Sequence, residues 1–302
     1  MPCAPTRSSA WRGRVVDRLK RRLALLATAL ITVGVLVAVV WLVDVRLIGS
    51  ALSRTDPLWI AGAVVVSALI NVVLGAEAIR FILQGLGVRI SRSVALRATV
   101  GNLALQGVLP AATGNLSRAA WLVKTQQTPV AETTAAAVLT VIFKVTSFGI
   151  LAGLGWAWMG GSAMHGAGLA LGLVAALVAV VIARKTASDW VALTAGFGFA
   201  GSMVGSELVV FYLILRALGV VADPALILAW MPLALIGAKL PLTVLGVGTR
   251  EALVVVLFTG LADPAVLAAA ALLHSFVVHV APSVIGTALT FGFLREALNP
   301  SD

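Results

Sequence analysis

The chain has 302 residues, of which 60% are hydrophobic and only 11% are charged, and its mean hydropathy is +1.06. Soluble proteins have about 45–50% apolar and about 25% charged residues, so this composition excludes a soluble globule and predicts an all-α polytopic membrane protein. The formal net charge of +10 indicates a membrane surface rather than nucleic acid as the partner, because the basic residues cluster before the first apolar segment and no folded domain carries them. The single cysteine, Cys3, allows neither an intramolecular disulfide nor a thiolate metal cluster, and no cofactor is expected.

Residues 1–22 form a basic segment ahead of the first apolar run, 23–43. Its Arg and Lys side chains predict a cytoplasmic N-terminus that attracts anionic lipid headgroups. We interpret 23–43 as a retained membrane helix rather than a cleaved signal peptide. It is longer than the usual signal-peptide apolar region of about 7–15 residues, and no small-residue cleavage site follows it.

Segments long enough to cross a bilayer follow along the chain. A hydrocarbon core about 30 Å thick needs about 20 apolar residues at about 1.5 Å rise per residue. The predicted crossings are at about 23–43, 57–83, 132–158, 166–183, 190–215 and 264–293. They make up a single membrane domain, 23–293, which is followed by a cytoplasmic tail, 294–302.

Two further apolar sections, 95–123 and 224–260, are interrupted by helix-breaking residues. Pro110 divides the first section into two limbs, each too short to cross alone. The interruptions in the second are Pro232, Pro241, Gly246 and Gly248. Both sections are predicted to be broken, re-entrant hairpins.

The charges around these segments favour one orientation, with both termini in the cytoplasm of a cell (plasma or inner) membrane. The segments placed inside carry basic residues, whereas the outer loops are neutral or acidic, which is a positive-inside pattern. The inner basic residues are Arg89, Arg92, Lys124, Arg184, Lys185 and Arg295.

The chain also resembles itself at an offset of about 132 positions. Residues 83–88 (LQGLGV) match 215–220 (LRALGV), and Leu-Pro pairs, Gly114 with Gly246, and Arg118 with Arg250 recur in the same order. Each half, about 23–158 and about 164–293, contains three crossings and one hairpin, so the second half is inverted relative to the first. Inverted-topology repeats with broken helices near the midplane are typical of secondary transporters. Chance similarity in an Ala-, Val-, Leu- and Gly-rich chain is the alternative interpretation.

The strongest candidate ligand groups are the two arginines, Arg118 and Arg250. Each follows a glycine-containing turn, which includes Gly114 and Asn115 in the first case and Gly246 and Gly248 in the second. Free backbone N–H groups, a helix dipole and a guanidinium at such a position suit a phosphate or carboxylate. Alternatively, each arginine caps its own turn or pairs with a neighbouring carboxylate, such as Glu251.

Lys144 lies in the middle of a predicted crossing, where a charge costs roughly 2.5–3.5 kcal/mol to insert. It should therefore face the protein interior with a carboxylate partner, for which Glu77 and Glu207 are the candidates. The functional interpretation is a headgroup ligand or proton relay, and the structural one is an ion pair. Lys239 adds positive charge at the second break, and Asn102 and Asn115 could line the cavity or satisfy broken backbone. No metal site is expected, because His274 and His279 are five residues apart and do not share a helix face.

These residues resemble a known family. Asn102, Leu109-Pro110, Gly114 and Arg118, with the later Leu-Gly-Val-Gly-Thr-Arg-Glu run that ends at Glu251, look like the lysylphosphatidylglycerol synthase transmembrane region, or flippase-like domain. The resemblance covers about residues 20–295. It implies movement of a phospholipid or polyprenyl-linked lipid between leaflets. Members that synthesise aminoacylated lipid carry a soluble aminoacyltransferase domain after the membrane part, and this chain ends at Asp302 without one.

The leading hypothesis is therefore a lipid flippase or transporter for an anionic phospholipid or polyprenyl-phosphate-linked lipid, with the headgroup held between the two hairpins. It is not expected to be an enzyme, because no carboxylate pair, metal cluster or activated serine is evident. An accessory protein of a lipid- or envelope-synthesis complex is the second hypothesis, and a membrane-embedded lipid-phosphate enzyme is the third. Membrane lipids are the expected partners, while a homo-oligomer or an envelope-synthesis partner stays open.

Overall fold

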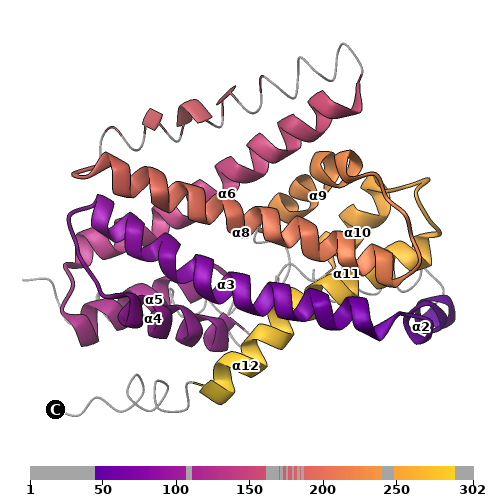
Figure 1. Ribbon diagram of the computed structural model, residues 1–302, viewed down its shortest axis with the longest axis horizontal. Helices are drawn as coiled ribbons and strands as arrows, with labels where there is room; N and C mark the ends of the chain where they lie inside the picture. Colours follow the sequence, from indigo (N-terminus) through magenta and orange to yellow (C-terminus); the bar gives the residue numbers. More distant parts are fainter. Residues whose placement is uncertain are drawn as a thin grey trace, which may run out of the picture.

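The computed structural model describes residues 45–106, 111–160, 187–239 and 248–289, with isolated helical positions between 170 and 184. These ranges are almost entirely helical (Figure 1). The helices are α2 (Val45–Ser53), α3 (Pro57–Gly85), α4 (Arg92–Gln106), α5 (Ala111–Gln126), α6 (Val130–Met159), α8 (Trp190–Ala217), α9 (Pro224–Lys239), α10 (Thr249–Leu257), α11 (Pro264–Ser275), the π-helical turn η2 (Phe276–Val280) and α12 (Ala281–Leu289). The predicted segments 1–22, 23–43 and 294–302, and most of 166–183, lie outside the described residues.

Four helical stretches of the described chain are long and apolar enough to cross a membrane. They are Pro57–Gly85, Val130–Met159, Trp190–Ala217 and Pro264–Val284, the last formed by α11, η2 and the start of α12. They confirm four of the six predicted crossings and make the chain a multi-pass membrane protein. The helices α4, α5 and α9 have 15, 16 and 16 residues. At about 1.5 Å per residue they are about 22–24 Å long, which is less than the bilayer core of about 30 Å.

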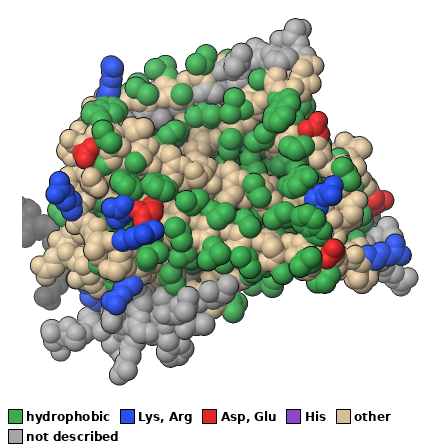
Figure 2. Space-filling view, viewed as in Figure 1, with side chains coloured by type: hydrophobic (Ala, Val, Ile, Leu, Met, Phe, Trp, Pro, Cys, Tyr) green, Lys and Arg blue, Asp and Glu red, His purple; other side chains and the backbone are tan. Residues whose placement is uncertain are grey.

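The surface fits a bilayer environment. Hydrophobic side chains spread over the face that carries α3 and α8, while Lys, Arg, Asp and Glu side chains lie mainly toward its ends (Figure 2). Large apolar side chains such as Leu58 and Val191 are 78% and 82% exposed. Apolar exposure of this kind along long helices is what lipid contact requires.

Aspartate residues fix the starts of several helices. Asp56, Asp223 and Asp263 each precede a proline, and each carboxylate accepts from the backbone N–H two residues further on, at 2.8–2.9 Å. Proline suits the first helical position because its missing N–H would have no helical partner there. Asp189 caps α8 in the same manner through the N–H of Ala192. The Asp-Pro sequence therefore marks where α3, α9 and α11 begin.

The helices α3 and α8 form an antiparallel central pair, visible as the indigo and orange helices lying side by side in Figure 1. At one end, the Asp56 N–H donates to the Ala217 carbonyl at 3.0 Å, and at the other end, the Ser188 N–H donates to the Gly85 carbonyl at 2.8 Å. A Cβ added at Gly85 would lie only 2.9 Å from the Leu193 Cβ. The two backbones thus approach closely because α3 carries a glycine at this contact.

The same cap ends both central helices. Gly87 after α3 and Gly219 after α8 have φ angles of +88° and +75°, in the left-handed region that favours glycine. The following N–H groups, of Val88 and Val220, donate to the carbonyl five positions earlier at 2.8 and 2.9 Å. This pattern is a Schellman motif. The two segments predicted to be related, 83–88 and 215–220, therefore share one backbone conformation.

Helix neighbours also correspond between the two parts of the chain. The helix α4 packs against α3, α5 and α12, whereas α9 packs against α8, α10 and α6. The contact between α5 and α6 corresponds to the contact between α10 and α11. The contact between α3 and α6 corresponds to the contact between α8 and α11. The contacts made by the earlier helices are thus repeated by the later ones.

The predicted interruption at Pro232 is wrong, because α9 continues through this residue. A proline inside a helix removes one backbone hydrogen bond and crowds the preceding turn, but here the preceding turn packs tightly on α6. Gly155 of α6 faces the backbone of Ala229, and the rings of Trp156 and Trp230 meet edge to face with centroids 5.6 Å apart. We attribute the continuity of α9 to this packing.

Candidate functional site

The first turn of α10 places Arg250 and Glu251 in the protein interior. Gly248 is the residue before the helix and has a φ of +93°, which a side chain would disfavour. Its N–H donates to Oε2 of Glu251, the third helical residue, as in the carboxylate half of a capping box. This local geometry fixes the Glu251 side chain and turns the adjacent Arg250 inward, where it is 1% exposed.

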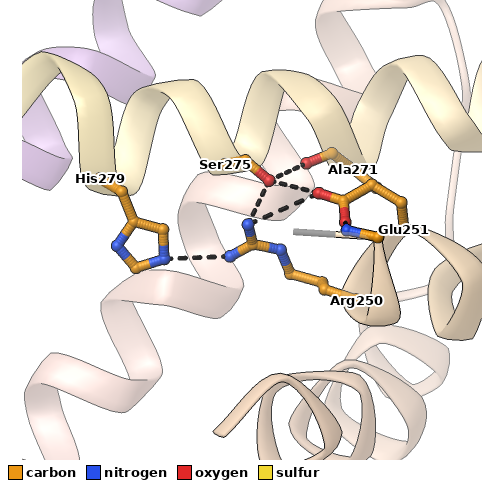
Figure 3. A network of polar contacts seen from close by, with 6 residues as sticks. Arg250, Glu251, Ala271, Ser275 and His279 are labelled. Atoms are coloured by element: carbon orange, nitrogen blue, oxygen red, sulfur yellow. Dashed lines mark hydrogen bonds and ion pairs between the residues drawn. The ribbon is translucent and has the colours of Figure 1, made fainter. Parts of the chain in front are cut away.

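Arg250 and Glu251, which are buried, and Ser275 and His279, which are half-buried, form a polar group that we call the Arg250 cluster (Figure 3). Arg250 Nη2 donates to Ser275 Oγ and lies 3.6 Å from Glu251 Oε1. Arg250 Nη1 lies 3.1 Å from His279 Nε2, and the Ser275 hydroxyl donates to Glu251 Oε1. The cluster joins α10 to α11 and to the π-helical turn η2.

One donor of the Arg250 guanidinium remains available. Its Nε atom is buried and has no hydrogen-bond acceptor among the described residues. A buried charge is stable only when it is paired and its hydrogen bonds are made. Since Glu251 is also bonded to Gly248 and Ser275, an additional anionic oxygen would complete the guanidinium's coordination.

The π-helical turn η2 orients His279. Such turns widen a helix locally and occur often at functional sites. The Ser67 hydroxyl of α3 donates to the Val277 carbonyl in this turn at 3.1 Å, and Asn71 Nδ2 donates to Ser67 Oγ at 3.2 Å. Polar side chains of α3 therefore satisfy backbone of the turn within a largely apolar interior.

His274 lies one residue before Ser275 and is fully buried. Its Nε2 is 3.3 Å from the backbone carbonyl of Glu207 on α8, and its ring meets Phe211 edge to face at a centroid distance of 5.8 Å. The Glu207 side chain is also buried, at 6% exposure. The structure therefore brings Glu207 into the same interior region as Arg250, whose charge it attracts.

In the earlier part of the chain, Glu77 is held by arginines. Its Oε2 is 2.6 Å from Arg80 Nη2, and its Oε1 is 2.6 Å from Arg92 Nε at the start of α4. Arg80 also lies over the Phe81 ring at 4.1 Å. Lys144 is half-buried on α6, and its pairing with Glu77 or Glu207 stays a prediction.

Arg118 is buried on α5 at 5% exposure. The predicted turn at 111–115 is wrong, because α5 begins at Ala111 and its early turns include Gly114 and Asn115. Two alanines directly after Pro110 favour a helix start there. Pro110, at which the break was predicted, lies outside the described residues.

The remaining candidates are placed as follows. Asn102 of α4 is buried, and its Oδ1 atom has no hydrogen-bond partner within the described chain. Lys239 is the last residue of α9, and Gly246 lies outside the described residues. Among the residues that the structure describes, no group of three or more His, Cys, Asp or Glu side chains could hold a metal ion.

Sequence reasoning missed Ser275 and His279 as members of the site. These two polar residues are four positions apart in an otherwise apolar helix, so they share a helix face. This spacing could have indicated that both belong to one site. Considering the two histidines only as a metal pair concealed it. The polar pair Ser67 and Asn71 on α3 has the same four-residue spacing and was also missed.

Four membrane-crossing helices, with charged side chains buried among the described residues, define a polytopic membrane protein. The family model described as the lysylphosphatidylglycerol synthase TM region matches residues 24–187, more than half of the chain, and the chain belongs to this family. The matched segment includes Glu77, Arg118 and Lys144, whereas the Arg250 cluster lies beyond it. No curated protein matches the chain.

Proposed function

We propose that the protein moves an anionic lipid between the two leaflets, either a phospholipid or a polyprenyl-phosphate-linked lipid, and that it catalyses no covalent reaction. Membership of the family implies a lipid-related function in the membrane. The observation that carries the proposal is the buried Arg250, whose Nε donor has no acceptor among the described residues. A lipid phosphate supplies the charged oxygens that a guanidinium binds most strongly.

The short helices support two hairpins that enter from opposite sides. The helix α4 begins near the end of α3. The helix α6 runs parallel to α8, and α8 begins where α3 ends, so α6 starts at this same end of the molecule. Gly201 faces Ser147, and Phe197 meets Phe143, at the same spacing along α6 and α8. By contrast, α9 follows the opposite end of α8, and α11 starts there as well. Helices of about 22–24 Å that leave on the side they entered fit re-entrant hairpins.

The corresponding contacts and caps support an inverted repeat. Exchanging the earlier helices for the later ones reproduces the set of helix neighbours, and Gly87 and Gly219 end α3 and α8 with the same motif. An antiparallel pairing of α3 with α8 is what a two-fold axis in the membrane plane requires of equivalent helices. Two half-sites that face opposite sides allow one lipid site to be exposed alternately.

The distribution of charge supports an orientation with both termini in the cytoplasm. The end of the molecule where α3 ends and α8 begins carries most of the basic residues, beside Asp189 and Glu132, and the other end carries three acidic helix caps beside Arg54 and Arg216. The basic residues are Arg80, Arg89, Arg92, Arg97 and Lys124, and the caps are Asp56, Asp223 and Asp263. The basic end corresponds to the cytoplasmic side by the positive-inside rule.

The Arg250 cluster contains a serine, a histidine and a carboxylate, but its geometry does not favour a hydrolytic enzyme. The single proton of the Ser275 hydroxyl has Glu251 and the Ala271 carbonyl as its acceptors, while His279 Nε2 faces the guanidinium. An activated serine requires its hydroxyl hydrogen-bonded to the base. Since the base here is engaged by a cation, we propose ligand binding rather than nucleophilic catalysis.

Reconstitution into proteoliposomes tests the proposal directly. Fluorescently labelled phosphatidylglycerol in the inner leaflet should become accessible to an impermeant quencher faster with the protein than without it. Arg118→Ala and the neutral double variant R250Q/E251Q should abolish this movement. The double variant avoids leaving Glu251 as an uncompensated buried charge, and folding is checked by circular dichroism and gel filtration.

Arg216→Gln is the matched control, because Arg216 lies at the end of α8 beside the ring of Trp59, away from the Arg250 cluster. It should retain wild-type movement. Wild-type rates in both the Arg118 and the Arg250 variants would overturn the proposed headgroup site. Absence of movement by the wild type, together with a stable envelope-synthesis partner in a pull-down, would favour the accessory-protein alternative.

A further inference from the structure

The contact between Arg250 and His279 fixes the protonation state of the histidine. Arginine has only donors and stays charged in proteins. At 3.1 Å from Arg250 Nη1, His279 Nε2 must therefore act as the acceptor. The imidazole is then neutral and carries its proton on Nδ1.

A proton on His279 Nε2 is incompatible with this arrangement. Both ring nitrogens would then be donors, and the half-buried imidazolium would face the buried Arg250 guanidinium, another positive group. The hydrogen bond would be lost and replaced by repulsion. Proton occupancy at Nε2 and the observed position of the guanidinium therefore exclude each other.

The surrounding charges leave this linkage intact. Within the described chain, the elements that pack against η2 are α3, α11 and α12, and α10 reaches it through Arg250. These elements carry the following charged or titratable side chains: Glu77 and Arg80 on α3, His274 on α11, and Arg250 and Glu251 on α10. The Glu207 carboxylate on α8 also attracts Arg250. Glu77 and Arg80 pair with each other, and α12 carries no charged side chain. Two carboxylates thus attract one guanidinium, and the cluster can accept one further positive charge.

The Glu251 carboxylate keeps hydrogen bonds of its own when Arg250 is released. Ser275 Oγ lies 2.9 Å from the Ala271 carbonyl as well as within hydrogen-bond distance of Glu251 (Figure 3). Its single proton can stay hydrogen-bonded to Glu251 Oε1 when the guanidinium leaves. Glu251 keeps the N–H of Gly248 at the helix start. Glu251 therefore keeps two hydrogen bonds, and the released arginine needs an anionic partner.

We propose that His279 is a proton-binding site, and that a proton at Nε2 frees the Arg250 guanidinium for an anionic ligand, so that lipid movement is proton-dependent. The coupling to movement rests on the proposed function, whereas the linkage between His279 and Arg250 does not. The ligand is recognised by its charged phosphate oxygens.

Labelled phosphatidylglycerol movement should be measured in proteoliposomes between about pH 5 and pH 8, the range in which histidine changes charge. The wild-type rate should depend on pH, by up to about tenfold per pH unit, the limit for one titrating group. His279→Gln should give a flat profile, because glutamine can accept from Arg250 but cannot bind a proton. His274→Gln, a variant of the other histidine on the same span, should keep the wild-type slope. A pH-independent wild type, or an unchanged slope in His279→Gln, would overturn the proposal.

A second measurement needs no transport. In nanodiscs, the side-chain ¹⁵N resonance of Arg250, identified by its loss in Arg250→Lys, should shift across the same pH range in the wild type and stay fixed in His279→Gln. A wild-type resonance that ignores pH overturns the linkage even if the variant does not fold. A shifting resonance without any lipid movement at any pH would refute the proposed function and leave the proton site standing.

Discussion

Replacing Gly155 with alanine tests the contact that joins α6 to α9. An added Cβ would lie 2.2 Å from the Ala229 nitrogen, 2.5 Å from the Leu228 carbonyl carbon and 2.7 Å from the Ala229 Cα. All three atoms belong to the backbone, so no side chain can rotate away. The helices must separate, and we expect Gly155→Ala to destabilise the protein.

The size of the effect follows from this geometry. Carbon atoms in ordinary contact are about 3.5–4.0 Å apart, so the helices must move by about 1–1.5 Å locally. Overpacking of this kind costs about 1–3 kcal/mol. An edge-to-face pair such as Trp156 with Trp230 contributes about 0.5–1.5 kcal/mol, and the separation of the helices loses a fraction of this contribution. Alanine recovers up to about 1 kcal/mol through its higher helix propensity. The net loss in free energy of unfolding should be about 1–3 kcal/mol.

Gly198→Ala on α8 provides the matched control. A Cβ added at Gly198 would have nothing within 4 Å, so only the helix-propensity term applies, and this variant should gain about 0.5–1 kcal/mol. The assay is equilibrium unfolding in mixed micelles with increasing dodecyl sulfate, followed by tryptophan fluorescence. If Gly155→Ala unfolded at the wild-type midpoint or later, the close packing of α6 on α9 would be refuted.

Two further predictions concern helix ends. Gly87→Ala and Gly219→Ala should each lower the free energy of unfolding by about 1–2 kcal/mol, the cost of a left-handed residue. Gly87→Ala should be slightly more destabilising, because its Cβ would meet Ser188 Oγ at 3.3 Å. No loss in the same unfolding assay would contradict the shared cap. The hydrogen bond from the Ala192 N–H holds the pKa of Asp189 below its usual value. The stabilisation from this carboxylate is therefore complete above the unfolded-state pKa of about 3.9. It is lost as the pH falls through the folded-state pKa. Asp189→Asn keeps the cap acceptor without titrating, and its melting temperature should therefore fall less than that of the wild type below about pH 4; parallel acid profiles would refute this assignment.

The sequence predicted the membrane-crossing helices because bilayer insertion depends on local properties. Length and hydropathy alone locate α3, α6 and α8, and an aspartate followed by proline locates the start of α11 at Pro264. The interruption assigned to Pro232 was wrong because a tertiary contact decides the outcome there. Propensity at one residue cannot anticipate that Gly155, far away in the sequence, allows α9 to pack closely on α6.

The partners of the buried charges were less predictable for the same reason. Glu77 and Arg80 are three residues apart on one helix, a spacing that itself suggests pairing, whereas Arg92 reaches Glu77 only because α4 folds back on α3. His279 meets Arg250 across 29 positions and through a π-helical turn. Such a turn shifts the helix register by a residue, which no hydropathy pattern reveals.

The two halves of the proposed inverted repeat differ in chemistry. When α6 and α11 are aligned on Pro129 and Pro264, Thr140 falls opposite Ser275, and each hydroxyl donates to the carbonyl four residues earlier, at 2.7 and 2.9 Å. The same alignment places Lys144 opposite His279, and the repeat offset of Arg118 and Arg250 places Ala119 opposite Glu251. At these aligned positions the first half has an arginine, an alanine and a lysine, whereas the second has an arginine, a glutamate and a histidine. Because an unperturbed imidazole changes charge near neutral pH, the proton dependence proposed for the lipid site is assigned to His279 rather than to the corresponding position of the earlier part.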